Sequence, residues 1–261
     1  MGGERRLVDV GLRALLDVSG LTGKTIDSYH IAFMLAPRVN AAATYTRSNV
    51  RNDQRHNTFV ELAKKGDIDI LFHGDSITDW WQQAGAQGGK EVFEKYFGGQ
   101  KIANFAIAGD TTQGLLWGLK NGEGEGFSPK AIMLMIGTNN SNGKDNTSDE
   151  IAEGIEAIVK EIHKRSPKTK VLLLAVFPRA TVKDKDAQAA QTAKINAIND
   201  RIAKLDDGGK TVKYLDIGKK FLATDGSIPK EIMPDQLHLS PKGYRIWADA
   251  VAPTLKELMG S

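Results

Sequence analysis

The sequence predicts an α/β protein: a three-layer α/β/α sandwich built around a five-stranded parallel sheet. Two observations lead to this prediction. Five short apolar runs recur between residues 68 and 218, and segments with helical apolar spacing separate them. Neighbouring parallel strands need a crossover, usually a helix, and right-handed crossovers place helices on both faces of the sheet.

The five predicted strands are the apolar runs, whose lengths are typical of strands. In chain order they are IDILFHG (68–74), KIANFAIAG (101–109), KAIMLMIG (130–137), VLLLAVFP (171–178) and TVKYLDIG (211–218). Because each run is followed by a segment with helical apolar spacing, the runs are predicted to form βαβ units.

The predicted helices lie between and after these runs. They cover residues 111–122, 147–167, 186–209 and 241–260. The second has Thr147 or Ser148 as its N-cap, Glu150 close behind and Pro167 as its stop. The third ends in glycines, and the fourth carries proline in its first turn.

The first 50 residues differ from the rest of the chain. LVDVGLRALLDV (7–18) has helical apolar spacing, but the text that follows shows weak periodicity. We therefore divide the chain into an N-terminal extension, residues 1–50, and a folded domain, residues 51–261. The extension could be an ordinary packed segment, a non-native leader or a dimerisation arm.

Composition excludes several classes of function. The 261 residues contain no cysteine, which rules out disulfides, thiolate metal sites and cysteine nucleophiles. The net charge of +3 comes from 35 basic and 32 acidic residues without a basic stripe, so we expect no nucleic-acid partner. No run of 18 apolar residues occurs, so we expect no membrane span. The compartment stays unassigned: cytoplasmic, or secreted with a signal absent from this chain.

Candidate site residues follow the predicted strands at their carboxyl ends, where open parallel sheets bind ligands. Ser76 follows the first run, Gly109 the second and Asn139 the third, so all three should meet at one rim. MPDQLHLSP places Asp235 and His238 three residues apart in a loop before the last helix.

These residues are the parts of an acyl hydrolase. A serine hydroxyl such as that of Ser76 needs a base, and His238 can serve because imidazole titrates near neutrality. Asp235 could accept the other ring N–H of the histidine. The backbone N–H groups of Ser76 and Gly109, with the amide of Asn139, could surround an oxyanion.

Each piece alone also has a structural interpretation. Ser76 could be a helix N-cap, Asp235 and His238 could form a local hydrogen bond, Gly109 could be a strand-end glycine, and GTNN could be a turn. Their order and placement favour the catalytic interpretation.

Two further features bear on the predicted site: two adjacent tryptophans, and the possibility of a bound metal ion. Trp80 and Trp81 could contact substrate at the pocket rim, or one of them could pack beneath the first helix. We expect no metal site, because the histidines lack partners at ligand spacing and nothing in the spacing of Asp79, Asp110 and Asp235 requires one.

The sequence resembles the SGNH, or GDSL-type, hydrolase superfamily over about residues 66–258, and within it the esterases similar to platelet-activating-factor acetylhydrolase catalytic subunits. The segments that carry the resemblance are GDS (74–76), NFAIAGDTTQGLLWGLKNGE (104–123), IGTNN (136–140), EIAEGIEAIVKEI (150–162) and PDQLHLS (234–240). Residues 51–261 would then be an SGNH hydrolase domain with a flavodoxin-like fold and no metal or organic cofactor.

The resemblance also implies roles. Ser76 maps to the nucleophile, Asp235 and His238 to the acid and base, and Ser76, Gly109 and Asn139 to the oxyanion hole. The expected activity is hydrolysis of small-molecule acetyl or other short-chain esters, carried on a carbohydrate or a lipid. Rival interpretations are a lysophospholipase or thioesterase, a non-catalytic binding module and a metal-dependent phosphohydrolase. A homodimer is plausible from the resemblance and the N-terminal extension.

Overall fold

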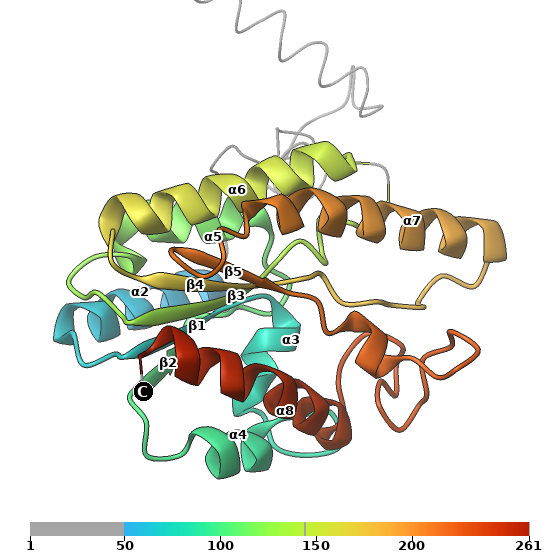
Figure 1. The fold of residues 1–261 in the computed structure, drawn as a ribbon, viewed down its shortest axis with the longest axis horizontal. Helices are drawn as coiled ribbons and strands as arrows, with labels where there is room; N and C mark the ends of the chain where they lie inside the picture. The colour runs from blue at the N-terminus through green and yellow to red at the C-terminus, as the bar shows by residue number, and fades with distance from the viewer. Residues whose placement is uncertain (1–49, 144, 261) are drawn as a thin grey trace, which may run out of the picture.

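A five-stranded parallel sheet between two layers of helices forms the protein (Figure 1). The computed structural model describes residues 50–143 and 145–260. The predicted helix over residues 7–18, and all but the last residue of the predicted extension, lie outside the described residues.

The strand order is β2-β1-β3-β4-β5, and all four pairings are parallel. The strands are β1 Ile70–Gly74, β2 Ile102–Asn104, β3 Ala131–Met135, β4 Lys170–Leu174 and β5 Val212–Leu215. This order is that of flavodoxin-like folds, so the predicted fold class is confirmed. The second strand is shorter than its apolar run, because the chain leaves the sheet after Asn104.

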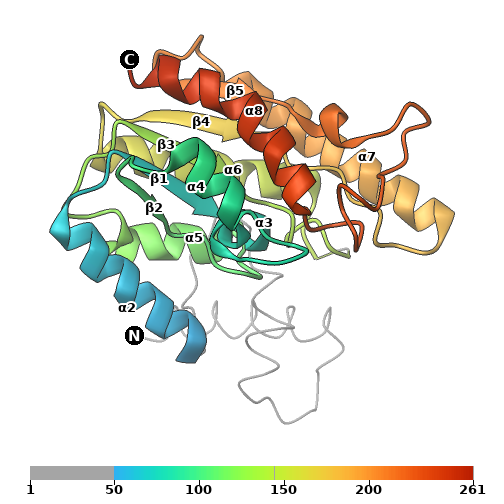
Figure 2. The same cartoon turned by 90° about the horizontal axis from the view of Figure 1, so that it is seen from below.

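The helices flank the sheet on both sides (Figures 1 and 2). They are α2 Val50–Lys65, α3 Ser76–Asp79, α4 Lys90–Phe97, α5 Thr112–Gly118, α6 Ser148–Arg165, α7 Lys185–Ile202 and α8 Pro241–Leu258. Helices α5, α6 and α7 cover one face, and α4 and α8 cover the other. The four predicted helices are present, although α7 ends at Ile202 and not at the predicted glycines, residues 208–209. Helix α2 was not predicted.

Helix α6 begins where its sequence predicts. The Thr147 hydroxyl accepts from the backbone N–H of Glu150 at 3.2 Å, and the Glu150 carboxylate accepts from the Thr147 N–H at 2.8 Å. This capping box satisfies two backbone donors that the first turn leaves unpaired. The helix ends at Arg165, with Ser166 as its C-cap before the predicted stop at Pro167.

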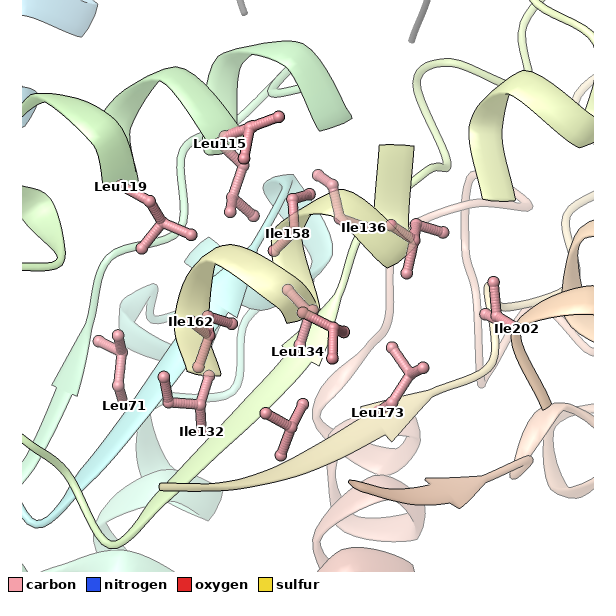
Figure 3. Packing of buried hydrophobic residues seen from close by; sticks show 14 of the residues in the cluster. Leu71, Leu115, Leu119, Ile132, Leu134, Ile136, Ile158, Ile162, Leu173 and Ile202 are labelled. Carbon is pink, nitrogen blue, oxygen red and sulfur yellow. The ribbon is translucent and has the colours of Figure 1, made fainter. Parts of the chain in front are cut away.

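Two buried clusters hold the layers together, one on each face of the sheet. Alternate residues of β1 serve different faces: Leu71 packs with the helices of one face and Phe72 with those of the other. Figure 3 shows the first cluster, to which Leu134 and Leu173 of the sheet and Ile158 of α6 belong. Because helices bury both faces, the central strands can be apolar throughout. None of the described helices has the length and apolarity to cross a membrane.

Candidate active site

Ser76 is the first residue of α3, two residues beyond the end of β1. Asp75, not Ser76, is the N-cap, because its carboxylate accepts from the Ile77 N–H at 3.0 Å. The N-cap interpretation of Ser76 is therefore wrong, and its hydroxyl is left for other partners. Gly74 permits this tight turn, since a Cβ there would lie 2.2 Å from the Met135 carbonyl oxygen.

The nucleophile candidate and the base candidate are in contact, although 162 residues separate them. The Oγ of Ser76 and the Nε2 of His238 lie 2.9 Å apart, within hydrogen-bond distance. On the other side of the ring, Nδ1 of His238 lies 2.7 Å from Oδ2 of Asp235. The structure thus brings together all three residues that the sequence assigns to a catalytic triad.

The Asp235–His238 geometry is built locally. The second carboxylate oxygen of Asp235 accepts from the backbone N–H groups of Leu237 at 3.0 Å and His238 at 2.7 Å. Gln236 bridges them with a left-handed backbone, at φ 65°. Burial raises the pKa of Asp235, but the hydrogen bonds and charge of His238, together with the Leu237 N–H, hold this pKa below its usual value.

Besides Ser76, the oxyanion candidates belong to the loops after β2 and β3. Gly109 has φ 81°, a left-handed conformation that favours glycine. The side-chain amide of Asn139 donates to the Asp110 carbonyl at 2.7 Å, which ties the two loops together beside Gly109. An amide carries two hydrogens, so Asn139 retains one for a further acceptor.

The two tryptophans have different environments. Trp80 is half-buried and stacks on His238, with ring centroids 3.9 Å apart. Trp81 is fully buried among aromatic residues of the core, including Tyr244 and Trp247. The prediction that Trp81 contacts substrate is therefore wrong. Trp80 keeps its place beside the site.

Two buried titratable residues at the site, Asp75 and Arg179, were not predicted. Asp75 is fully buried, and this burial raises its pKa to about 7. Arg179 is buried too, and its Nη1 donates to the Thr138 carbonyl at 3.3 Å. Burial lowers the pKa of Arg179, although Asp75 and Asp235 favour its charged form. Arg179 lies beyond the carboxyl end of β4, as Ser76 lies beyond that of β1. This position is the sequence signal that could have identified Arg179 as a site residue.

The carboxylates considered as metal ligands have other partners. Asp79 pairs with Arg55 at 2.8 Å, and Asp235 contacts His238. Among residues 50–143 and 145–260, no three histidine or acidic side chains are grouped as metal ligands would be.

The arrangement can move a proton. A hydroxyl bonded to an imidazole, whose other nitrogen faces a carboxylate, can give up its hydrogen while its oxygen attacks an electrophile. The N–H groups of Ser76 and Gly109 and the amide of Asn139 are the available donors for the negative charge that then develops.

The GDSL-like lipase/acylhydrolase family model matches residues 72–246. Fold and sequence therefore place this chain in that family of hydrolases, which act on esters. Among its relatives is platelet-activating factor acetylhydrolase IB subunit alpha2 of Homo sapiens. That protein is 37% identical over 212 residues, which cover 78% of this chain and 85% of the relative.

Solved structures share the fold. A GDSL-like lipase from Bacteroides thetaiotaomicron has a TM-score of 0.62 and 18% identity, covering 79% of this chain and 97% of that one. Est24, a carbohydrate acetylesterase from Sinorhizobium meliloti, has a TM-score of 0.54 and 21% identity, covering 73% of this chain and 99% of that one.

Proposed function

We propose that the protein is a serine esterase that removes short acyl groups, acetyl above all, from small-molecule esters. The observation that carries the proposal is the hydrogen-bonded series Ser76–His238–Asp235, with distances of 2.9 and 2.7 Å. It lies where ligands bind in this type of sheet.

In the first half of the reaction, the Ser76 oxygen attacks the ester carbonyl carbon while its proton passes to Nε2 of His238. Asp235 orients the ring through Nδ1 and stabilises the imidazolium that forms. The N–H groups of Ser76 and Gly109, with the Asn139 amide, hold the oxyanion. Collapse of the tetrahedral intermediate expels the alcohol, which takes its proton from His238.

In the second half, water releases the acyl group from Ser76. His238 takes a proton from the water as its oxygen attacks the acyl carbon, and then returns a proton to the Ser76 oxygen as the carboxylic acid leaves. The lowered pKa of Asp235 supports this role, because it keeps the carboxylate charged when the imidazolium forms.

The preference for acetyl rests on two observations. The human relative, 37% identical, is by name an acetylhydrolase. The sequence also has no long apolar insert that would shelter a fatty chain. On the alcohol side, an acetylated carbohydrate or an acetylated lipid fits the proposal, and Trp80 is the aromatic residue beside His238 that such a group would meet.

A chain-length profile tests the acyl preference. Purified protein is assayed with p-nitrophenyl esters from acetyl to decanoyl, and kcat/KM should be highest at the acetyl end. A maximum at octanoyl or longer would instead indicate a lysophospholipase or thioesterase. Complete inactivity on every ester, with retained ligand binding, would indicate a non-catalytic module.

The alcohol moiety is tested with natural acetyl donors: acetylated sugars, xylan fragments and an acetylated ether phospholipid. Acetate release is measured for each at equal acetyl concentration. One class should exceed the simple aryl acetates in kcat/KM, since remote contacts raise the rate when they are used in the transition state.

A further inference from the structure

Asp79 has no role in the mechanism above, yet it joins three segments at the site. It lies three residues after Ser76, at the end of the same short helix α3. Its Oδ1 accepts from Nη2 of Arg55, on α2, at 2.8 Å. Its Oδ2 accepts from the backbone N–H of Ala108 at 3.2 Å, and Ala108 immediately precedes Gly109.

Arg55 contacts the same loop a second time. Its Nη2 also donates to the Ala106 carbonyl at 2.6 Å, so one guanidinium reaches both the carboxylate of Asp79 and the loop after β2. The side chain of Arg55 is 27% exposed and that of Asp79 is 10% exposed, so the pair is largely shielded from water. Hydrogen bonds between charged partners are stronger than neutral ones, and shielding strengthens them further.

A neutral side chain supports the same junction. Asn104, at the end of β2, donates to the Thr78 carbonyl of α3 at 2.7 Å and accepts from the Ala106 N–H at 3.0 Å. Helix α3 and the loop that carries Gly109 are therefore joined at two places, through Asn104 and through Asp79 with Arg55.

This junction matters because two oxyanion donors belong to different segments. The N–H of Ser76 is at the start of α3, whereas the N–H of Gly109 is in the loop after β2. Both must point at one oxygen within a few tenths of an ångström. Glycine restricts its own backbone little, and a Cβ at Gly109 would meet nothing within 4 Å. The loop therefore depends on neighbouring residues for its position.

We propose that Arg55 and Asp79 are positioning residues that fix the Gly109 N–H relative to the Ser76 N–H. They would raise the rate by holding the oxyanion hole in register, without touching substrate. This inference rests on the proposed esterase function, because it assumes that an oxyanion forms at this position.

A positioning pair and a purely structural ion pair should have different effects on the kinetics. A misplaced oxyanion donor weakens binding of the transition state and leaves binding of the ground-state ester nearly unchanged, so kcat should fall while KM stays almost constant. An ion pair that only braced α2 would change the melting temperature and leave kcat unaltered.

The experiment compares Arg55→Ala, Arg55→Lys, Asp79→Ala and the double alanine variant with p-nitrophenyl acetate, well below each melting temperature. Arg201→Ala is the matched control. It removes an arginine that pairs with Asp149 at 2.7 Å and Glu153 at 3.1 Å on the outer helices.

Both single alanine variants should lower kcat by about tenfold to a hundredfold, with KM changed by less than about threefold. Arg55→Lys, which keeps the charge, should recover most of the lost rate. The double variant should be no slower than the slower single variant, because both act through one junction. Arg201→Ala should keep the wild-type kcat.

Wild-type kcat in Arg55→Ala and Asp79→Ala would overturn the inference, as would losses that match those of Arg201→Ala. If Asp79→Ala does not fold, the kcat values of Arg55→Ala and Arg55→Lys are sufficient to test the inference. Ser76→Ala distinguishes failure of the positioning inference from failure of the proposed function. If Ser76→Ala is inactive while the Arg55 and Asp79 variants are fully active, only the positioning inference is refuted. An active Ser76→Ala refutes the proposed function.

Discussion

The indole of Trp80 stacks on the imidazole of His238, with ring centroids 3.9 Å apart and 24° between the planes. The ring that bridges Ser76 and Asp235 is thus held from its face by Trp80 as well as at both nitrogens. Such a contact limits tilting of the imidazole without using its hydrogen-bonding atoms.

Loss of this stack should slow the reaction moderately. We expect Trp80→Leu to lower kcat by about fivefold, since an aromatic pair contributes about 1 kcal/mol, and Trp80→Phe to retain most activity. Steady-state kinetics with an aryl acetate measure both. Trp117→Leu is the control, because Trp117 is also half-buried and packs on a histidine, His56, at 4.7 Å. Equal effects at the two tryptophans would contradict a specific role for the stack.

Ser76→Ala should abolish nearly all turnover while the fold persists. Removal of the nucleophile eliminates the acyl-enzyme route, so kcat should fall by roughly a thousandfold or more. Circular dichroism and the melting temperature report the fold. Ser227→Ala, at an exposed serine bonded to Asp225, should keep full activity. Retention of wild-type kcat in Ser76→Ala would exclude it as the nucleophile.

Asn139→Ala should lower kcat by about a hundredfold, as loss of one oxyanion donor does elsewhere. KM should change little, because the contact strengthens only in the transition state. Asn121→Ala provides the comparison: its amide also donates to a backbone carbonyl, that of Trp117, at 2.7 Å, but on an exposed segment. An unchanged rate in Asn139→Ala would mean that its amide points away from the oxyanion.

Asp75 should make stability depend on pH. Its pKa of about 7 in the folded protein lies above the ordinary value of 3.8, so folding favours the neutral acid. The unfolded chain therefore releases its proton first as pH rises. Between about pH 4 and 7 the folded state then loses up to about 1.4 kcal/mol per pH unit relative to an Asp75→Asn variant.

Urea unfolding of wild type and Asp75→Asn at several pH values measures this difference. It should grow from pH 4 to 7 and level off above. Asp184→Asn is the control, because Asp184 caps α7 through the same kind of bond, 2.9 Å to the Ala187 N–H, but is exposed. The same pH dependence in both variants would show that burial of Asp75 is not its cause.

Local signals in the sequence predict much of the fold. The strands are continuous aliphatic runs because helices bury both sheet faces, and α6 begins at Thr147 because its capping box is formed by residues three apart. Helix α2 escapes such reasoning. It is mostly polar, and within residues 54–65, where burial is described, its buried apolar residues Phe59 and Ala63 are one turn apart.

Some residues of the site can likewise be predicted from the sequence, and others cannot. Ser76, Asp235 and His238 can be predicted because each follows a strand or precedes the last helix. They also lie in the sequence motifs that resemble those of the family. Which of Trp80 and Trp81 faces the site cannot be predicted, because the turn after α3 places two adjacent and chemically identical residues in different environments. The Arg55–Asp79 pair is likewise a tertiary contact, between residues 24 positions apart.

The acid and the base occupy one short loop, whereas the nucleophile belongs to the sheet's first crossover. Its bonds to neighbouring segments include the one from the Ala180 N–H to the Gln236 carbonyl at 3.0 Å and the one from the Gln236 amide to the Ile228 carbonyl at 3.1 Å. Detachment of this single segment would disconnect Asp235 and His238 from Ser76 together, while every strand stayed paired. On gradual heating, catalysis should therefore vanish before ellipticity does, and amide exchange in the loop should precede exchange in β1.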